Sequence, residues 1–110
     1  MACAALALWG IAGSATAQSP APAKTVLVVG DSLSAEYGLA RGTGWVALLE
    51  ARLASQKLPF QVVNASISGD TTSGGRSRLP GLLKQYKPAG VVIELGGNDA
   101  LRGLPLNMTR

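Results

Sequence analysis

TVLVVG, the sequence of residues 25–30, joins five apolar or β-branched residues without a break and ends in a glycine. Such a run, with no alternation of polar residues, is typical of a strand that is buried on both faces of a parallel sheet. Farther along the chain, the sequences FQVVN at 60–64 and VVIEL at 91–95 predict a second and a third strand. The three strands together predict a sheet whose two faces are both covered by other elements.

Two segments between these strands have the spacing of helices. Their apolar stripes consist of Trp45, Leu48, Leu49 and Leu53 in the segment 44–56, and of Leu79, Leu82, Leu83 and Tyr86 in the segment 72–86. Residues spaced by three and four lie on one face of a helix, and we expect Trp45 and Tyr86 to belong to the core. Glycines at 74, 75 and 81 and a proline at 80 predict that the second helix begins late in its segment. Strands that alternate with helices indicate right-handed crossovers and an α/β fold, a three-layer α/β/α sandwich with a parallel sheet.

Length and composition exclude several classes of protein. With 110 residues, 47% of them hydrophobic and 15% charged, the chain is one domain or part of one, and it is neither a disordered tail nor a coiled coil. The net charge of +4 comes from basic residues spread singly along the chain, which disfavours a nucleic-acid partner. One cysteine, at position 3, and no histidine exclude an internal disulfide, a Cys-His metal site and a complete Ser-His or Cys-His catalytic pair within these residues.

The N-terminal segment differs from the rest, because residues 1–17 carry no charged side chain. Residues 2–13 form an apolar stretch that is too short for the roughly 20 residues of a membrane-spanning helix, and the small residues up to Ala17 have the pattern of a signal-peptidase site. We therefore expect residues 1–17 to be a signal peptide cleaved after Ala17 and 18–23, QSPAPA, to be a linker. The protein is then periplasmic or secreted, without a stable membrane anchor. A buried or frayed N-terminal helix is the alternative.

Ligands of open parallel sheets bind at the carboxyl ends of the strands, which directs attention to three loops. Their sequences are GDSLS at 30–34, ASISGDT at 65–71 and GGND at 96–99. A hydroxyl at a strand-to-helix turn can attack a carbonyl, and glycine and asparagine can bring N–H donors to the oxyanion that results. Each loop alone is more often an ordinary turn or helix cap. Their order and their positions at the strand ends favour acyl-transfer chemistry.

Three blocks of the sequence, GDSLS at 30–34, NASISGDT at 64–71 and ELGGND at 94–99, are similar to those of one enzyme superfamily. Over about residues 24–104 the chain resembles the SGNH (GDSL) hydrolases, and among them the bacterial periplasmic group of thioesterase I, arylesterases and lysophospholipases. The resemblance implies the flavodoxin-like SGNH fold, Ser32 as the nucleophile, and an oxyanion hole made by the backbone N–H groups of Ser32 and Gly69 with the side-chain amide of Asn98. It also implies a serine esterase or thioesterase that hydrolyses small-molecule acyl esters through a Ser32 acyl-enzyme and needs no cofactor and no metal.

The remaining polar residues of these loops have a simpler explanation. Asp31, Asp70 and Asp99 each follow a glycine or an asparagine, and we expect their carboxylates to accept hydrogen bonds from nearby backbone N–H groups as Asx turns. This structural role is favoured over an acid-base pair or a metal site. The hydroxyls of Ser66 and Ser68, close to Gly69, are predicted to brace the loop and not to act as second nucleophiles.

The sequence departs from the family pattern in one respect. The resemblance implies a further Asp-x-x-His block near the C-terminus, which supplies the general base, and the 110 residues contain no histidine. We therefore expect residues 24–110 to be the N-terminal part of a hydrolase domain whose C-terminal half is missing, catalytically incomplete as given. The apolar face and edge of the third strand should then be exposed.

Two other functions remain open. One is a non-catalytic acyl- or glycan-binding remnant of the same fold. The other is a different α/β enzyme, such as a phosphotransferase that uses Asp31, although the chain has no Gly-Lys-Ser/Thr phosphate loop.

Overall fold

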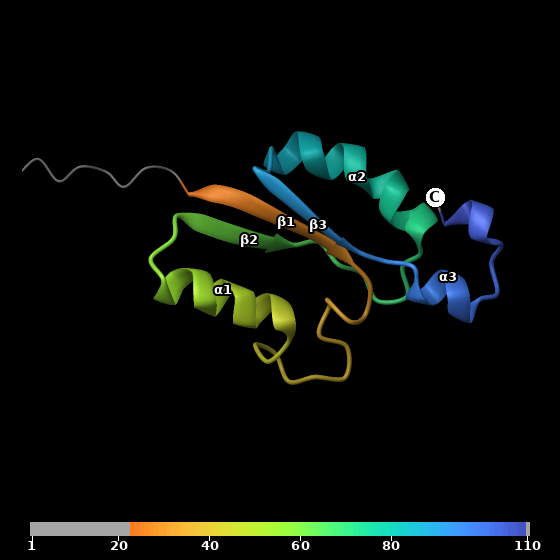
Figure 1. Ribbon diagram of the computed structural model, residues 1–110, viewed down its shortest axis with the longest axis horizontal. Helices are drawn as coiled ribbons and strands as arrows, with labels where there is room; N and C mark the ends of the chain where they lie inside the picture. The colour runs from red at the N-terminus through yellow and green to blue at the C-terminus, as the bar shows by residue number, and fades with distance from the viewer. Residues whose placement is uncertain (1–22, 110) are drawn as a thin grey trace, which may run out of the picture.

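The computed structural model describes residues 23–109, so the predicted signal peptide and most of the predicted linker lie outside the described residues. Strands alternate with helices along this part of the chain (Figure 1). The elements are, in chain order, β1 (Lys24–Gly30), α1 (Trp45–Ser55), β2 (Phe60–Asn64), α2 (Thr72–Tyr86), β3 (Gly90–Glu94), α3 (Gly97–Leu101) and the 3-10 helix η1 (Leu106–Met108). The three predicted strands are confirmed, with bounds that differ by at most one residue at each end.

β1 is the central strand of a parallel sheet with the order β2-β1-β3. Val26 pairs with Val62 of β2 on one side and with Gly90 of β3 on the other. The chain passes from β1 to one neighbour and then crosses back to the other. α1 and α2 cover opposite faces of the sheet, as Figure 1 shows, which is what the general right-handed rule requires of crossovers that run in opposite directions. The predicted α/β/α sandwich with a parallel sheet is confirmed.

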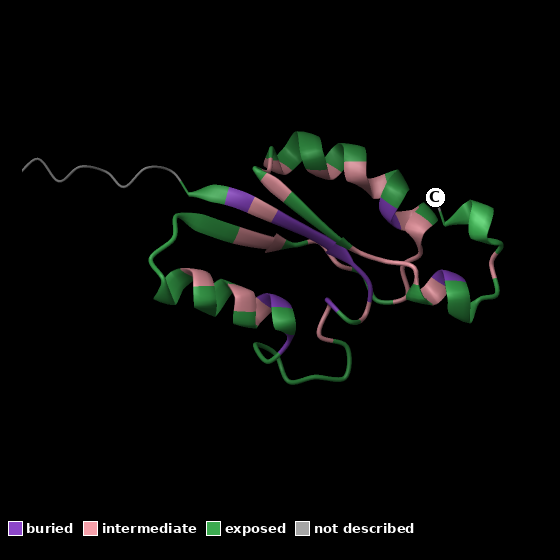
Figure 2. Ribbon diagram, in the orientation of Figure 1, coloured by how far each residue is buried: buried purple, intermediate pink, exposed green. Residues whose placement is uncertain are grey.

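The core is centred on β1. Leu27, Val28 and Val29 are almost fully buried, and this strand forms the longest buried segment in Figure 2. Successive residues of a strand point to opposite faces, so a strand between two helical layers has to be apolar at every position. The uninterrupted run in the sequence has this cause.

The face that α1 turns toward the sheet differs from the predicted stripe. Val46 is buried and Leu49 and Leu53 are half-buried, whereas Leu48 is 61% exposed. The buried stripe therefore contains Val46, and the predicted Trp45 and Leu48 lie outside it. Both stripes include Leu49 and Leu53, so the spacing of apolar residues in a helix of eleven residues does not distinguish them.

α2 begins at Thr72, so the prediction of a late start is wrong. The hydroxyl of Thr71 caps the helix by accepting a hydrogen bond from the Gly74 N–H at 3.2 Å. Gly75 is buried, and a Cβ at this position would overlap the side chain of Leu95. The early glycines of α2 therefore mark close packing of helix against sheet, which overrides their low helix propensity.

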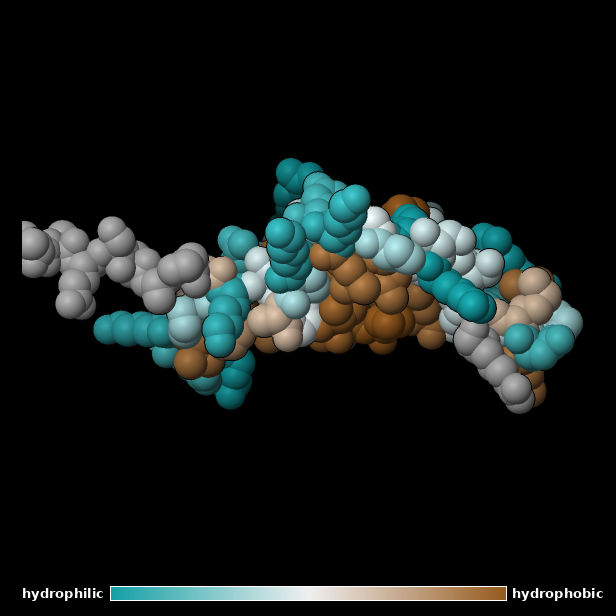
Figure 3. All heavy atoms as spheres, turned by 90° about the horizontal axis from the view of Figure 1, so that it is seen from above, coloured by the Kyte–Doolittle hydropathy of each residue, from teal (hydrophilic) through white to brown (hydrophobic). Residues whose placement is uncertain are grey.

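The outer side of β3 is apolar and open, as predicted for the third strand. Val91 and Val92 are each 39% exposed and Ile93 is 60% exposed. A pocket of about 680 Å³ lies between β3 and α2, and Figure 3 shows the hydrophobic surface beside the hydrophilic side chains of the helix. Its lining includes Leu79 and Leu95. Among residues 23–109, no helix has the length and apolar character that crossing a membrane requires.

Candidate active site

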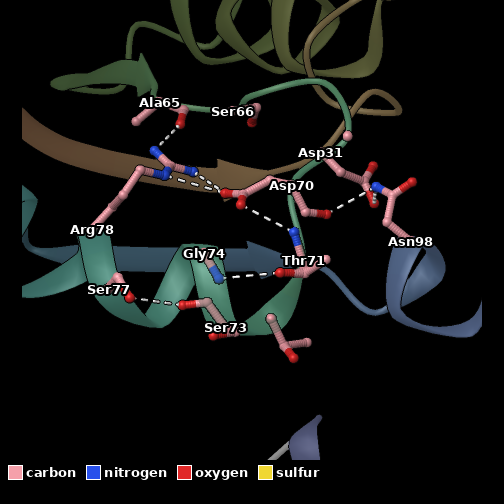
Figure 4. Close-up of polar contacts among 12 residues, drawn as sticks. Asp31, Ala65, Ser66, Asp70, Thr71, Ser73, Gly74, Ser77, Arg78 and Asn98 are labelled. Carbon is pink, nitrogen blue, oxygen red and sulfur yellow. Dashed lines mark hydrogen bonds and ion pairs between the residues drawn. The ribbon is translucent and has the colours of Figure 1, made fainter. Parts of the chain in front are cut away.

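The loops that follow β1, β2 and β3 meet at one end of the sheet. The chain crosses from β1 to β2 over one face of the sheet and from β2 to β3 over the other. In an open parallel sheet, such a reversal leaves a crevice at the carboxyl end of the central strand, which here is β1. Asn98 joins the loops: its Nδ2 donates to the Asp70 carbonyl oxygen at 2.9 Å and lies 3.4 Å from Asp31 Oδ2 (Figure 4). Asp31 precedes Ser32 and Asp70 follows Gly69. The three predicted site residues are thus brought together, Ser32 and Gly69 in loops and Asn98 on the first turn of α3, which contacts both loops.

The loop that carries Ser32 is a tight turn held by Asp31. The buried Asp31 carboxylate accepts a hydrogen bond from the Leu33 N–H at 3.0 Å, and its carbonyl accepts from the Ala35 N–H at 2.9 Å. The predicted Asx turn is confirmed for this residue. Ser32 is half-buried in this turn and is the second residue after the central strand.

Hydrogen bonds among three side chains, those of Trp45, Ser34 and Glu94, hold the turn that carries Ser32. The indole Nε1–H of Trp45 donates to Ser34 Oγ at 3.0 Å, and Ser34 Oγ–H donates to Glu94 Oε1 at 2.7 Å. The same carboxylate oxygen lies 3.4 Å from the backbone nitrogen of Asp31. These hydrogen bonds link α1, the turn and the end of β3. Trp45 is therefore not the core residue that its helical position predicts, and it remains 37% exposed.

The loop at 65–71 is bent at Gly69, whose φ of 83° lies in the left-handed region that favours glycine. Arg102 Nη2 donates to the Gly69 carbonyl oxygen at 2.8 Å, which fixes the peptide on one side of this glycine. The prediction that the Ser66 hydroxyl braces the loop is wrong, because its Oγ is buried and has no hydrogen-bond partner among the described residues. Its backbone does so instead, as the Ser66 N–H donates to Asn64 Oδ1 at 3.2 Å.

Asp99 ties two helices together and does not form a local turn. Its carboxylate accepts hydrogen bonds from the Thr72 N–H at 2.8 Å and from the Thr72 hydroxyl at 2.6 Å, so the predicted Asx turn is wrong for this residue. These hydrogen bonds from Thr72 hold the pKa of Asp99 below its ordinary value, because they stabilise the charged carboxylate. The contact fixes the first turn of α3, and with it Asn98, against the first turn of α2.

Asp70 combines a local hydrogen bond with an ion pair. Its Oδ1 accepts a hydrogen bond from the N–H of the next residue, Thr71, at 3.0 Å, and its Oδ2 lies 2.6 Å from Arg78 Nη2. The predicted bond to a nearby backbone N–H is therefore present, but the Asx turn is wrong for this residue, because such a turn needs the N–H two residues on. Residues 23–109 contain no cluster of three or more carboxylate, thiol or imidazole side chains that could hold a metal ion. The carboxylates of this site hold loops in place.

Comparison with known proteins agrees with this arrangement. The model of the GDSL-like lipase/acylhydrolase family matches residues 28–110. The chain belongs to this family. "Esterase TesA" of Pseudomonas aeruginosa is 58% identical to it over 100 residues, 91% of this chain and 50% of that protein. "Thioesterase 1/protease 1/lysophospholipase L1" of Escherichia coli K12 is 52% identical over 89 residues, 81% of this chain and 41% of that protein.

A solved member of the GDSL-like family has the same fold. The crystal structure of TesA superposes with a TM-score of 0.76 at 60% sequence identity, over 78% of this chain and 48% of that one. The resemblance to the SGNH (GDSL) hydrolases is confirmed, and the similar family members are esterases and thioesterases. The chain spans about half the length of the curated relatives it matches.

Proposed function

We propose that this protein is a serine esterase or thioesterase of the arylesterase and lysophospholipase type, which hydrolyses small-molecule acyl esters with Ser32 as the nucleophile. The observation that carries the proposal is the contact of the Asn98 amide with the loops of Ser32 and Gly69 at the carboxyl end of the central strand. A hydroxyl and several N–H donors that converge on one crevice are what acyl transfer requires.

In this mechanism, Ser32 Oγ attacks the acyl carbonyl and the negative charge that develops on the carbonyl oxygen is stabilised by N–H donors. The donors are the backbone N–H groups of Ser32 and Gly69 and the Asn98 amide. One N–H of this amide is held at 2.9 Å by the Asp70 carbonyl, whereas its contact with Asp31 is longer, at 3.4 Å. The second N–H of the amide is therefore available to a substrate. In the reaction, the substrate oxyanion takes the place of Asp31 and accepts a hydrogen bond from this N–H. Departure of the alcohol or thiol leaves an acyl group on Ser32, which water then removes.

Ser32 also needs a general base, because a serine hydroxyl is a weak nucleophile at neutral pH. The 110 residues contain no histidine, so under this proposal they are catalytically incomplete by themselves. The activity is proposed for the full product of the gene. No cofactor enters the proposed mechanism, since the oxyanion hole supplies the electrostatic stabilisation.

The test is the Ser32→Ala variant of the full gene product, assayed on p-nitrophenyl butyrate and on an acyl thioester. We expect kcat to fall by about 10⁴-fold or more, because the variant cannot form the acyl-enzyme. Ser77→Ala, an exposed position on α2, is the matched control and should retain full activity. Turnover that survives Ser32→Ala removes Ser32 from the mechanism.

A second candidate is a non-catalytic acyl- or glycan-binding remnant of the same fold. The intact mass of the native product distinguishes the two. A mass near twice that of residues 18–110 supports the esterase. A mass that matches these residues alone, with binding of acyl chains but no turnover, supports the remnant.

We also propose that the protein is exported to the periplasm or the medium, on the basis of the apolar stretch at 2–13 and the small residues that follow it up to Ala17. N-terminal sequencing of the product in the periplasmic and secreted fractions tests this. A mature chain that begins at Gln18 is expected, and a product found only in the cytoplasm with Met1 intact contradicts it.

A further inference from the structure

Arg78, on the second turn of α2, holds both ends of the loop at 65–71. Its Nη1 donates to the Ala65 carbonyl oxygen at 2.8 Å, and its Nε and Nη2 donate to Asp70 Oδ2 at 3.2 and 2.6 Å (Figure 4). Ala65 is the first residue after β2 and Asp70 is the second residue before α2. One planar guanidinium therefore fixes the width of the whole loop.

Asp70, near the far end of this loop, is connected to two of the three donors of the proposed oxyanion hole, those of Gly69 and Asn98. The Asp70 carbonyl oxygen accepts the 2.9 Å hydrogen bond from Asn98 Nδ2, and the Asp70 backbone follows Gly69 directly. A displacement of Asp70 consequently moves the Asn98 amide and the Gly69 peptide together.

We propose that Arg78 and Asp70 form a positioning pair for the oxyanion hole, in which Arg78 sets the place of Asp70 and Asp70 sets that of the Asn98 amide. The inference rests on the proposed esterase function. Neither side chain contacts the reacting atoms, so both are positioning residues.

The surroundings of the Asp70 carboxylate make its place well defined. It also accepts from the Thr71 N–H at 3.0 Å, and Gly74 lies beneath it, where a Cβ would overlap Oδ1. The side chain of Asp70 is only 12% exposed and that of Arg78 is 26% exposed, so solvent screens this pair less than an ordinary surface ion pair. The bonds to two acceptors on different residues need the rigid fork of a guanidinium, which lysine lacks.

The role is tested with Arg78→Lys in the full gene product, against Arg52→Lys on the exposed face of α1 as the matched control. Initial rates with p-nitrophenyl butyrate give kcat and KM separately, and thermal unfolding gives Tm. Since small displacements of catalytic donors cost large rate factors, we expect kcat of Arg78→Lys to fall about 10- to 100-fold, while KM changes by less than about 3-fold. The control should match the unmodified protein. An unchanged kcat in folded Arg78→Lys overturns the proposal.

A double-mutant cycle separates positioning from a general loss of stability. In an Asn98→Ala background the donor that the pair positions is gone, so Arg78→Lys should then lower kcat by less than about 3-fold. The same factor in both backgrounds overturns the proposal. If Arg78→Lys does not fold, Asp70→Asn, which keeps the backbone carbonyl and a side-chain acceptor, replaces it in the same cycle.

Labelling of Ser32 by a fluorophosphonate keeps this inference distinct from the proposed function. If the unmodified protein is not labelled at Ser32, the esterase proposal fails and the positioning role fails with it. If Ser32 is labelled and Arg78→Lys retains its kcat, only the positioning role fails. Addition of guanidinium ion to Arg78→Ala should restore part of the lost kcat, and no rescue would point to a purely structural role.

Discussion

Ser34 offers the sharpest test of how the turn that carries Ser32 is held. Its hydroxyl donates to Glu94 at 2.7 Å and accepts from the Trp45 indole at 3.0 Å, and Ser34 is only 1% exposed. In Ser34→Ala the carboxylate loses a donor and the indole N–H loses its acceptor, and water has little access to replace the hydroxyl. A hydrogen bond to a charged group contributes about 1.5–3 kcal/mol and a neutral one about 0.5–1.5 kcal/mol. We therefore expect the free energy of unfolding to fall by about 2–4 kcal/mol.

The assay is urea unfolding of the full gene product, followed by circular dichroism, with Ser77→Ala as the control. Ser77 is exposed on α2, and its replacement should change the unfolding free energy by less than about 0.5 kcal/mol. Glu94→Gln keeps an acceptor for the Ser34 hydroxyl and should cost less than Ser34→Ala. If Ser34→Ala is as stable as the control, the three side chains do not hold the turn, and the reasoning about this network is refuted.

Two further predictions concern the packing of α2 and the junction between α2 and α3. Gly75→Ala should destabilise the protein by about 1–3 kcal/mol, because the added Cβ overlaps Leu95. Gly81→Ala, where the added Cβ meets open space, should be neutral or up to about 1 kcal/mol stabilising. Thermal unfolding of the two variants checks both values. Hydrogen bonds from Thr72 lower the pKa of Asp99 in the folded protein, so its contribution to stability is fully present above about pH 4 and is lost as the pH falls through the folded-state pKa. Asp99→Asn should therefore lose less stability than the unmodified protein between pH 5 and pH 2, as urea unfolding at each pH measures, and an identical pH profile would argue against the Asp99 contact.

The positions of the three strands and the arrangement of a sheet between two helical layers could be predicted from the sequence. The runs around Val28, Val62 and Val92 are continuous because parallel strands form a sheet between two helical layers, and this pattern is local. The face of α1 and the start of α2 were not predictable in the same way. Both depend on contacts with residues distant in sequence, such as that between Gly75 and Leu95, which a local pattern does not contain.

For the site, the sequence indicated which loops meet and left out what holds them. Glu94 was the one charged residue in an otherwise apolar strand, a signal that could have marked it as part of a polar network. Arg78 gave no such signal, because a basic residue on an exposed helix is ordinary. The role of Arg78 depends on two acceptors, the Ala65 carbonyl and the Asp70 carboxylate. Only the folded loop brings both of them to one guanidinium.

The account depends most on Ser32 as the residue that carries the acyl group. The decisive measurement is acid quenching of the full gene product during turnover of p-nitrophenyl acetate, followed by peptide mass analysis. The account predicts one acetyl group, on the peptide that contains Ser32, and none in Ser32→Ala. Turnover with the acetyl group on another residue would contradict it.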